Sequence, residues 1–98
     1  MFDDADIDAA VEGAIVAKSR NAGQTCVCAN RIYVQSGVYN EFSEKLSRRV
    51  SGLKVGNGFA KGSKIGQLID SSAVTKVREH LENALSLGAA RDGWRQIR

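Results

Sequence analysis

Apolar residues recur at helical spacing near the start of the chain. Over residues 5–19 the apolar positions share one helical face, and acidic residues stand at its beginning. An aspartate before a helix accepts hydrogen bonds from its free N–H groups, and carboxylates suit the positive end of the helix dipole. The pattern predicts an amphipathic helix over 5–19, which Asn21, Ala22 and Gly23 bring to an end. Its apolar positions are Ile7, Val11, Ala14, Ile15 and Ala17, and the acidic residues are Asp3, Asp4 and Asp6.

Two further helices are predicted on the same grounds. Ser36 is the expected cap of the second, and Asp70 or Ser71 that of the third, which Gly88 should end. Residues 54–69 are glycine-rich and predict an irregular connection between the two. The apolar stripes are Tyr39, Phe42, Leu46, Val50 and Leu53 in the second helix, and Val74, Val77, Leu81, Ala84 and Leu85 in the third. We expect the two stripes to pack on each other in part.

Residues 30–35, Asn-Arg-Ile-Tyr-Val-Gln, are rich in β-formers and flanked by turn residues, so they predict a strand. The predicted fold class is therefore α/β, in the order helix, loop with the cysteines, strand, helix, loop, helix. One strand cannot form a stable sheet. We interpret the chain as part of a larger α/β domain, and we expect its lone strand to pair with a second copy in a two-fold dimer.

Composition excludes several classes of protein. The chain has 98 residues, 43% of them apolar and 26% charged, which fits one small globular unit rather than a disordered chain. The net charge of +3 is dispersed, which argues against a nucleic-acid-binding surface. No apolar run is long enough to cross a membrane. The acidic start, where a secretory signal would be basic, leads us to expect a cytoplasmic protein.

The stretch Gly23-Gln24-Thr25-Cys26-Val27-Cys28 holds the most distinctive chemistry. Cysteine is often a small, buried and unreactive hydrophobic residue, and this structural role is the alternative to a chemical role for both thiols. A loop between a helix and a strand could instead expose a reactive thiol, and Gly23 would let the backbone approach a substrate closely. Two thiols and the distant His80 are too few ligands for zinc, so we predict no metal site. We expect His80 to be a surface residue.

Several segments, in order, resemble those of the aldehyde dehydrogenase superfamily. The segment Asn21-Ala22-Gly23-Gln24-Thr25-Cys26 is similar to the family's active-site cysteine motif. The similarity spans about residues 2–89, and Arg20 with the Cys-Val-Cys pair is closest to succinate-semialdehyde dehydrogenases. The other similar segments are Phe2–Asp8, Asn30–Gln35, Lys54–Gly58 and Ile65–Asp70.

The resemblance implies a mechanism. Cys26 would attack the aldehyde carbon, and the resulting thiohemiacetal would pass hydride to NAD or NADP to leave a thioester that water hydrolyses. The backbone N–H of Cys26 would form part of an oxyanion hole. Arg20 would hold a distal carboxylate of the substrate, since guanidinium matches carboxylate bidentately, although a solvated arginine at a helix end is the alternative. Cys28 would form a redox-switch disulfide with Cys26, or else be an inert second thiol.

The chain also departs from the family pattern. Ser19 stands where an aromatic or aliphatic residue is usual, Gln67 replaces the usual proline, and residues 90–98 diverge, so we divide the chain into a partial catalytic domain, 1–89, and a tail, 90–98. The family's general-base glutamate, its oxyanion asparagine and its dinucleotide-binding domain have no counterpart in these 98 residues. We expect the chain alone to bind no cofactor and to be inactive. The alternative is a non-catalytic structural or interaction protein, or an inert gene remnant.

Overall fold

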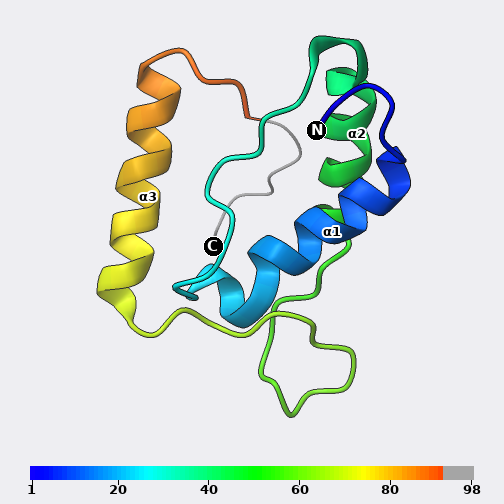
Figure 1. The fold of residues 1–98 in the computed structure, drawn as a ribbon. Coiled ribbons are helices and arrows are strands. Elements are labelled where there is room, and N and C mark those ends of the chain that lie inside the picture. Colours follow the sequence, from blue (N-terminus) through cyan, green and yellow to red (C-terminus); the bar gives the residue numbers. More distant parts are fainter. Residues whose placement is uncertain (92–98) are drawn as a thin grey trace.

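A computed structural model describes residues 1–91, which form three α-helices and one short 3-10 helix (Figure 1). The α-helices span Ile7–Ser19 (α1), Ser36–Ser51 (α2) and Ser71–Ser86 (α3), and the 3-10 helix spans Arg20–Gly23 (η1). No helix in this range is long and apolar enough to cross a membrane. Most of the predicted tail, residues 92–98, lies outside the described residues.

The helices begin close to the predicted residues. Asp6 caps α1, where its Oδ1 accepts the Ala9 N–H at 3.1 Å, and Asp70 caps α3, where its Oδ1 accepts the Ala73 N–H at 2.8 Å. The prediction that Ser36 caps α2 is wrong by one residue. Gln35 holds the cap position, and it makes no side-chain cap bond because its Oε1 accepts the N–H of Asp3 instead.

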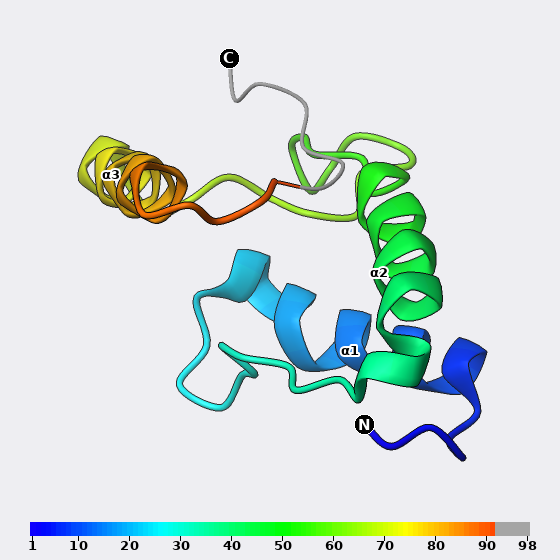
Figure 2. The same ribbon diagram turned by 90° about the horizontal axis from the view of Figure 1, so that it is seen from above.

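The core lies between α1 and α2, which cross each other (Figure 2). Val11 on α1 and Phe42 on α2 are 3% and 4% exposed, and no other described side chain is as fully buried. Two ion pairs join the rims of the same two helices, Arg49 to Glu12 and Lys45 to Asp8. The small core means that the packing of α1 on α2 depends on very few apolar contacts.

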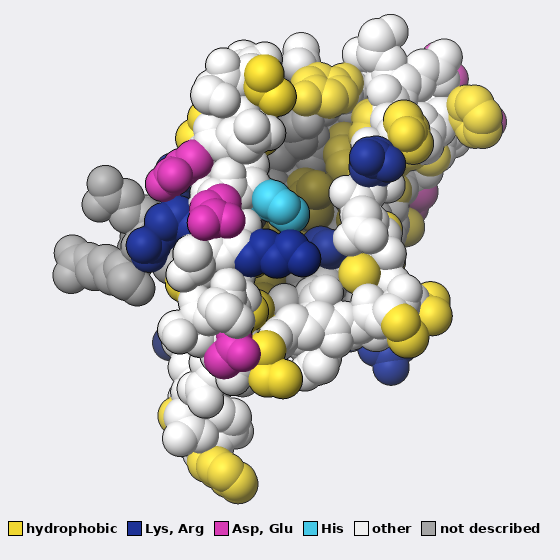
Figure 3. Space-filling model, turned by 90° about the vertical axis from the view of Figure 1, so that its left-hand side faces the viewer, with side chains coloured by type: hydrophobic (Ala, Val, Ile, Leu, Met, Phe, Trp, Pro, Cys, Tyr) yellow, Lys and Arg dark blue, Asp and Glu magenta, His cyan; other side chains and the backbone are white. Residues whose placement is uncertain are grey.

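Helix α3 stands apart, which corrects one expectation. It packs on neither α1 nor α2 in the described chain, and both views show it separated from them (Figures 1 and 2). Its apolar stripe stays open, with Val77 37% and Leu85 41% exposed. Seen from the side on which α3 lies, the surface of the molecule is hollowed, and apolar side chains lie deep in this hollow (Figure 3). The stripes of α2 and α3 do not meet because the connection after α2 carries α3 away from it.

The predicted strand at residues 30–35 is not formed, and no strand occurs within residues 1–91. A strand needs a neighbouring strand to pair with along its length. Within residues 1–91, the backbone partner of this segment that is distant in sequence is Met1, whose amino group donates to the Tyr33 carbonyl at 2.5 Å and whose carbonyl accepts the Gln35 N–H at 3.0 Å. The described chain is therefore helical, and the predicted α/β order is corrected at this element.

The connection between α2 and α3 is irregular, as predicted, but backbone hydrogen bonds join its two sides at one place. Val55 and Ile65 form an isolated parallel bridge, and the Lys64 N–H donates to the Lys54 carbonyl at 2.8 Å. Between these contacts the chain turns outward, and Phe59 is completely exposed.

Candidate active-site loop

The loop that carries both cysteines begins with an unusual backbone turn. Asn21, Ala22 and Gly23 follow one another with φ of 50°, 56° and 79°, all in the left-handed region. This conformation is natural for glycine and uncommon for alanine, so Ala22 stores strain. Such strain persists only where surrounding contacts impose it, and it is frequent at functional sites. The turn ends α1 and redirects the chain toward Cys26.

Side-chain hydrogen bonds hold this turn. Asn21 Nδ2 donates to the Gln24 carbonyl at 3.1 Å, and Gln24 Nε2 donates to the Asn21 carbonyl at 3.2 Å. Thr25 Oγ1 donates to the Arg20 carbonyl at 3.1 Å. The other end of the Gln24 amide reaches across the molecule, where its Oε1 accepts the Ile69 N–H at 2.9 Å. The polar residues of the motif thus fix the backbone that leads into Cys26, and they also tie the loop to the start of α3.

Cys26 itself is exposed, and it lines a broad open hollow of about 510 Å³ beside the last turns of α1. Arg20 and Cys28 line the same hollow, so the structure brings together all three site residues predicted from the sequence. The remaining wall is apolar. It consists of Val16, Ala17, Val27 and Ala29.

Arg20 is exposed, and its guanidinium has no carboxylate partner among the described residues. Its backbone carbonyl is engaged by Thr25, which fixes the base of the side chain next to the cysteine loop. An unpaired guanidinium in the same hollow as a thiol can receive an anionic group of a bound molecule. The arrangement is therefore suited to a substrate with a reactive carbon and a separate negative charge.

Cys28 differs from Cys26 because it is half-buried and surrounded by polar groups. Its Sγ lies 3.7 Å from the Gly23 carbonyl oxygen and 3.8 Å from Asn30 Oδ1. The ammonium of Lys18 lies 3.9 Å from the same sulfur and donates to Asn30 Oδ1 at 3.1 Å. Sequence analysis did not single out Lys18, because its position in the last turn of α1 indicates only a favourable helix-dipole charge.

The described residues that line the hollow include no acidic residue and no histidine. His80 is an exposed residue of α3, outside this hollow, and no three potential metal ligands gather within residues 1–91.

A dinucleotide does not fit the described residues either. Such a cofactor is usually bound where a strand passes through a glycine-rich turn into a helix. Within residues 1–91 there is no strand, and the loop with Gly56 and Gly62 leads into an exposed connection, so this arrangement does not occur in the described part of the chain.

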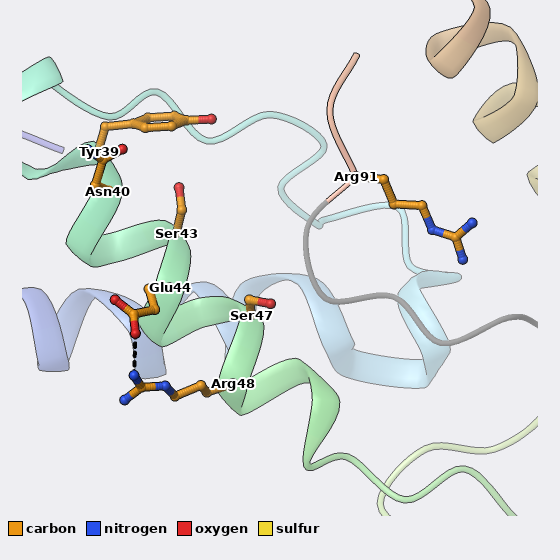
Figure 4. Close-up of a pocket in the computed structure, with 7 residues that line it drawn as sticks. All are labelled: Tyr39, Asn40, Ser43, Glu44, Ser47, Arg48 and Arg91. Atoms are coloured by element: carbon orange, nitrogen blue, oxygen red, sulfur yellow. Dashed lines mark hydrogen bonds and ion pairs between the residues drawn. The ribbon is translucent and has the colours of Figure 1, made fainter.

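A second hollow, of about 450 Å³, lies along the outer side of α2 (Figure 4). Its polar lining includes Glu44 and Arg48, which pair with each other one helical turn apart. None of the site residues predicted from the sequence belongs to it. The other lining residues are Tyr39, Asn40, Ser43, Ser47 and Arg91. The loop of Cys26 thus remains the candidate site.

Comparison with known proteins finds similarity to aldehyde dehydrogenases over most of the chain. Residues 1–91 match the model of a family described as "Aldehyde dehydrogenase family". The chain is 64% identical over 89 residues to a glutarate-semialdehyde dehydrogenase of Pseudomonas putida and 62% identical over 89 residues to the NADP(+) succinate-semialdehyde dehydrogenase GabD of Escherichia coli. Each alignment covers 91% of this chain and 18% of the relative. The chain thus spans less than a fifth of the length of these relatives.

Solved structures agree with the sequence matches. An aldehyde dehydrogenase from Brucella melitensis biovar abortus 2308 superposes with a TM-score of 0.88 at 64% identity, over 91% of this chain and 18% of that one. A betaine aldehyde dehydrogenase from Staphylococcus aureus, 34% identical, superposes with a TM-score of 0.87 over 99% of this chain and 20% of its own, and it was crystallised in complex with NAD+.

Proposed function

The chain belongs to the aldehyde dehydrogenase family, and we propose that it forms the nucleophile-bearing part of a semialdehyde dehydrogenase, with Cys26 as the nucleophile. The observation that carries this proposal is the exposed Cys26 in one hollow with the unpaired Arg20. In the complete enzyme we propose that residues 30–35 lie within an α/β domain.

The proposed chemistry on this chain is a single addition step. The Cys26 thiolate attacks the aldehyde carbon, a C–S bond forms, and the C=O π electrons move to oxygen, which then takes up a proton. The backbone N–H of Cys26 stabilises the developing oxyanion. This thiohemiacetal forms reversibly and needs no oxidant.

The oxidation that follows requires a hydride acceptor and a group that activates water, and we propose that both are bound outside residues 1–91. In relatives the hydride acceptor is a nicotinamide dinucleotide, as the NADP(+) in the E. coli enzyme's name and the bound NAD+ of the S. aureus enzyme indicate. The group that activates water to hydrolyse the thioester is proposed to lie outside the described residues that line the hollow. We therefore propose that these 98 residues by themselves form the adduct but do not turn over.

Arg20 sets the proposed substrate class, which is an aldehyde with a carboxylate at its other end. The P. putida and E. coli relatives are named for glutarate semialdehyde and succinate semialdehyde, which both have this form. The guanidinium would receive the carboxylate while Cys26 receives the aldehyde carbon. Cys28 is proposed as the second thiol of a Cys26–Cys28 disulfide, formed by exchange with a small-molecule disulfide that is itself reduced to two thiols, and this disulfide would block the addition step reversibly.

The test uses succinic semialdehyde labelled with ¹³C at the aldehyde carbon, with NMR detection of the thiohemiacetal carbon on the 98-residue chain. The resonance should be lost in Cys26→Ser and kept in Cys28→Ser. Arg20→Met should weaken adduct formation by about tenfold, since a charge-assisted contact contributes about 1.5 kcal/mol or more. With butanal, which lacks the distal carboxylate, Arg20→Met should change nothing. An adduct that survives Cys26→Ser and disappears in Cys28→Ser would overturn the assignment.

A further inference from the structure

The amine of Lys18 and the thiol of Cys28 are held beside each other. Lys18 Nζ lies 3.9 Å from Cys28 Sγ and donates a hydrogen bond to Asn30 Oδ1 at 3.1 Å. Cys28 Sγ in turn lies 3.8 Å from the same Asn30 oxygen. One amide oxygen thus contacts both a nitrogen nucleophile and a sulfur nucleophile, and it keeps the two within reach of each other.

The backbone around this pair fixes its geometry. The Ala29 N–H donates to the Ala17 carbonyl at 3.2 Å, so the segment with Cys28 is attached to the last turn of α1, which carries Lys18. The Lys18 side chain also runs past Gly23, where an added β-carbon would lie 3.7 Å from Lys18 Cε. Cys28 Sγ lies 3.7 Å from the Gly23 carbonyl oxygen. All of these contacts are formed by one short continuous segment, which positions both groups.

We propose that Cys28 and Lys18 form a relay that moves an acyl group from a soluble thioester onto the Lys18 amine. Near neutral pH an ordinary thiol is partly ionised, and its thiolate is intrinsically very nucleophilic, whereas an ordinary lysine amine is almost entirely protonated. Cys28 also lines the open hollow beside α1, through which a small thioester reaches the sulfur. The thiol therefore takes the acyl group first, and the amine receives it from the thiol.

The relay has two steps and needs no oxidant. In the first, the Cys28 thiolate attacks the thioester carbonyl, a C–S bond to Cys28 forms, and the donor's C–S bond breaks to release a thiolate that takes up a proton. In the second, the neutral Lys18 amine attacks the same carbonyl, a C–N bond forms, the C–S bond to Cys28 breaks, and the proton lost by nitrogen passes to the released sulfur. The second step is intramolecular, which favours Lys18 over lysines elsewhere. The product is an uncharged amide on Lys18 and a free Cys28 thiol. The relay is independent of the aldehyde addition at Cys26.

The test treats the 98-residue chain, kept reduced with a phosphine, with S-acetyl-N-acetylcysteamine at mildly alkaline pH and follows acetylation by mass spectrometry. Lys76 on α3 is the internal control, because it is exposed and makes none of the described cysteine contacts. Lys18 should be acetylated about tenfold faster than Lys76 or more, since a positioned neighbour gains at least this factor. Cys28→Ser should reduce the rate at Lys18 to that at Lys76, and Cys26→Ser should leave it unchanged. Equal acetylation of Lys18 with and without Cys28, or a loss in Cys26→Ser instead, overturns the proposal.

Two further measurements separate the relay from a change in the accessibility of Lys18. The N-hydroxysuccinimide ester of acetic acid acetylates amines directly, so it should label Lys18 equally in the unchanged chain and in Cys28→Ser. Lys18→Arg keeps the positive charge and removes the accepting amine, so the acetyl group should remain on Cys28, from which hydroxylamine releases it. If Cys28 carries no acetyl group in Lys18→Arg, or if Cys28→Ser lowers direct labelling as much as labelling by the thioester, the relay does not operate.

Discussion

Arg49 on α2 binds the carboxylate of Glu12 on α1 with two hydrogen bonds, Nε to Oε1 at 2.5 Å and Nη2 to Oε2 at 2.8 Å. The hydrogen bonds from Arg49 hold the pKa of Glu12 below its ordinary value. This pair connects residues 37 positions apart, whereas the neighbouring Arg48 pairs only with Glu44 on its own helix. Two adjacent arginines thus have different structural roles.

Arg49→Lys should lower the melting temperature more than Arg48→Lys does. Lysine keeps the charge but cannot make two parallel hydrogen bonds to one carboxylate. The effect should be small, because exposed ion pairs contribute little to stability. Thermal unfolding followed by circular dichroism measures it. Equal decreases in melting temperature for the two variants would mean that the ion pair between α1 and α2 stabilises the fold no more than the ion pair within α2.

Phe42→Ala should destabilise the chain by about 3–5 kcal/mol, the usual cost of truncating a buried phenylalanine. Small domains are often stable by only about 5 kcal/mol, so this variant should be largely unfolded. The same substitution at the fully exposed Phe59 is the control and should leave urea denaturation unchanged. If Phe59→Ala cost as much as Phe42→Ala, the core would lie elsewhere than between α1 and α2.

Acid should unravel the start of α3. The hydrogen bonds from Ser72 and from the Ala73 N–H lower the pKa of Asp70 in the folded chain. A carboxylate with a lowered folded pKa stabilises the structure above its unfolded pKa, and that stabilisation is lost as the pH falls through the folded pKa. Protection of the Ala73 amide from hydrogen exchange should therefore fall below about pH 4, near the ordinary pKa of aspartate. Asp70→Asn, which also caps helices, should show protection that does not change with pH over this range.

The Cys26 thiol should react with an alkylating reagent no more slowly than the Cys28 thiol. Cys26 is exposed, while Cys28 is half-buried with polar groups around its sulfur. Limited iodoacetamide treatment followed by mass spectrometry should label Cys26 at least as fast as Cys28. The single variants Cys26→Ser and Cys28→Ser allow each rate to be measured alone. Labelling of Cys28 with Cys26 untouched would reverse the roles given to the two cysteines.

The sequence predicted local features better than packing. Capping and helix ends depend on backbone groups within a few residues. Asp70, one of the two caps predicted for the third helix, caps α3, and Gly88, predicted to end it, is left-handed with φ 92°. The first helix was predicted to begin at residue 5, and its cap is Asp6. The strand at 30–35 and the packing of α3 depend on partners distant in sequence, and residues 1–91 do not provide them.

In the candidate site, too, the sequence indicated residues that are close along the chain but not contacts that depend on how the chain folds. Arg20, Cys26 and Cys28 were singled out because this stretch resembles the cysteine segment of the family, and in the structure all three line one hollow. The contact of Lys18 with Cys28 depends on how the chain folds back after the left-handed turn at Ala22, and helical spacing alone does not indicate it.

The most direct test of the account is an assay for reduced nicotinamide with the purified 98-residue chain, succinic semialdehyde, and NAD+ or NADP+. We propose that the nucleophile lies in this chain and that the cofactor site and the general base lie outside it. This proposal predicts no reduced nicotinamide above the level of a Cys26→Ala control, even where the ¹³C adduct is detected. Turnover clearly above that control would contradict it, because these residues alone would then provide the complete catalytic site.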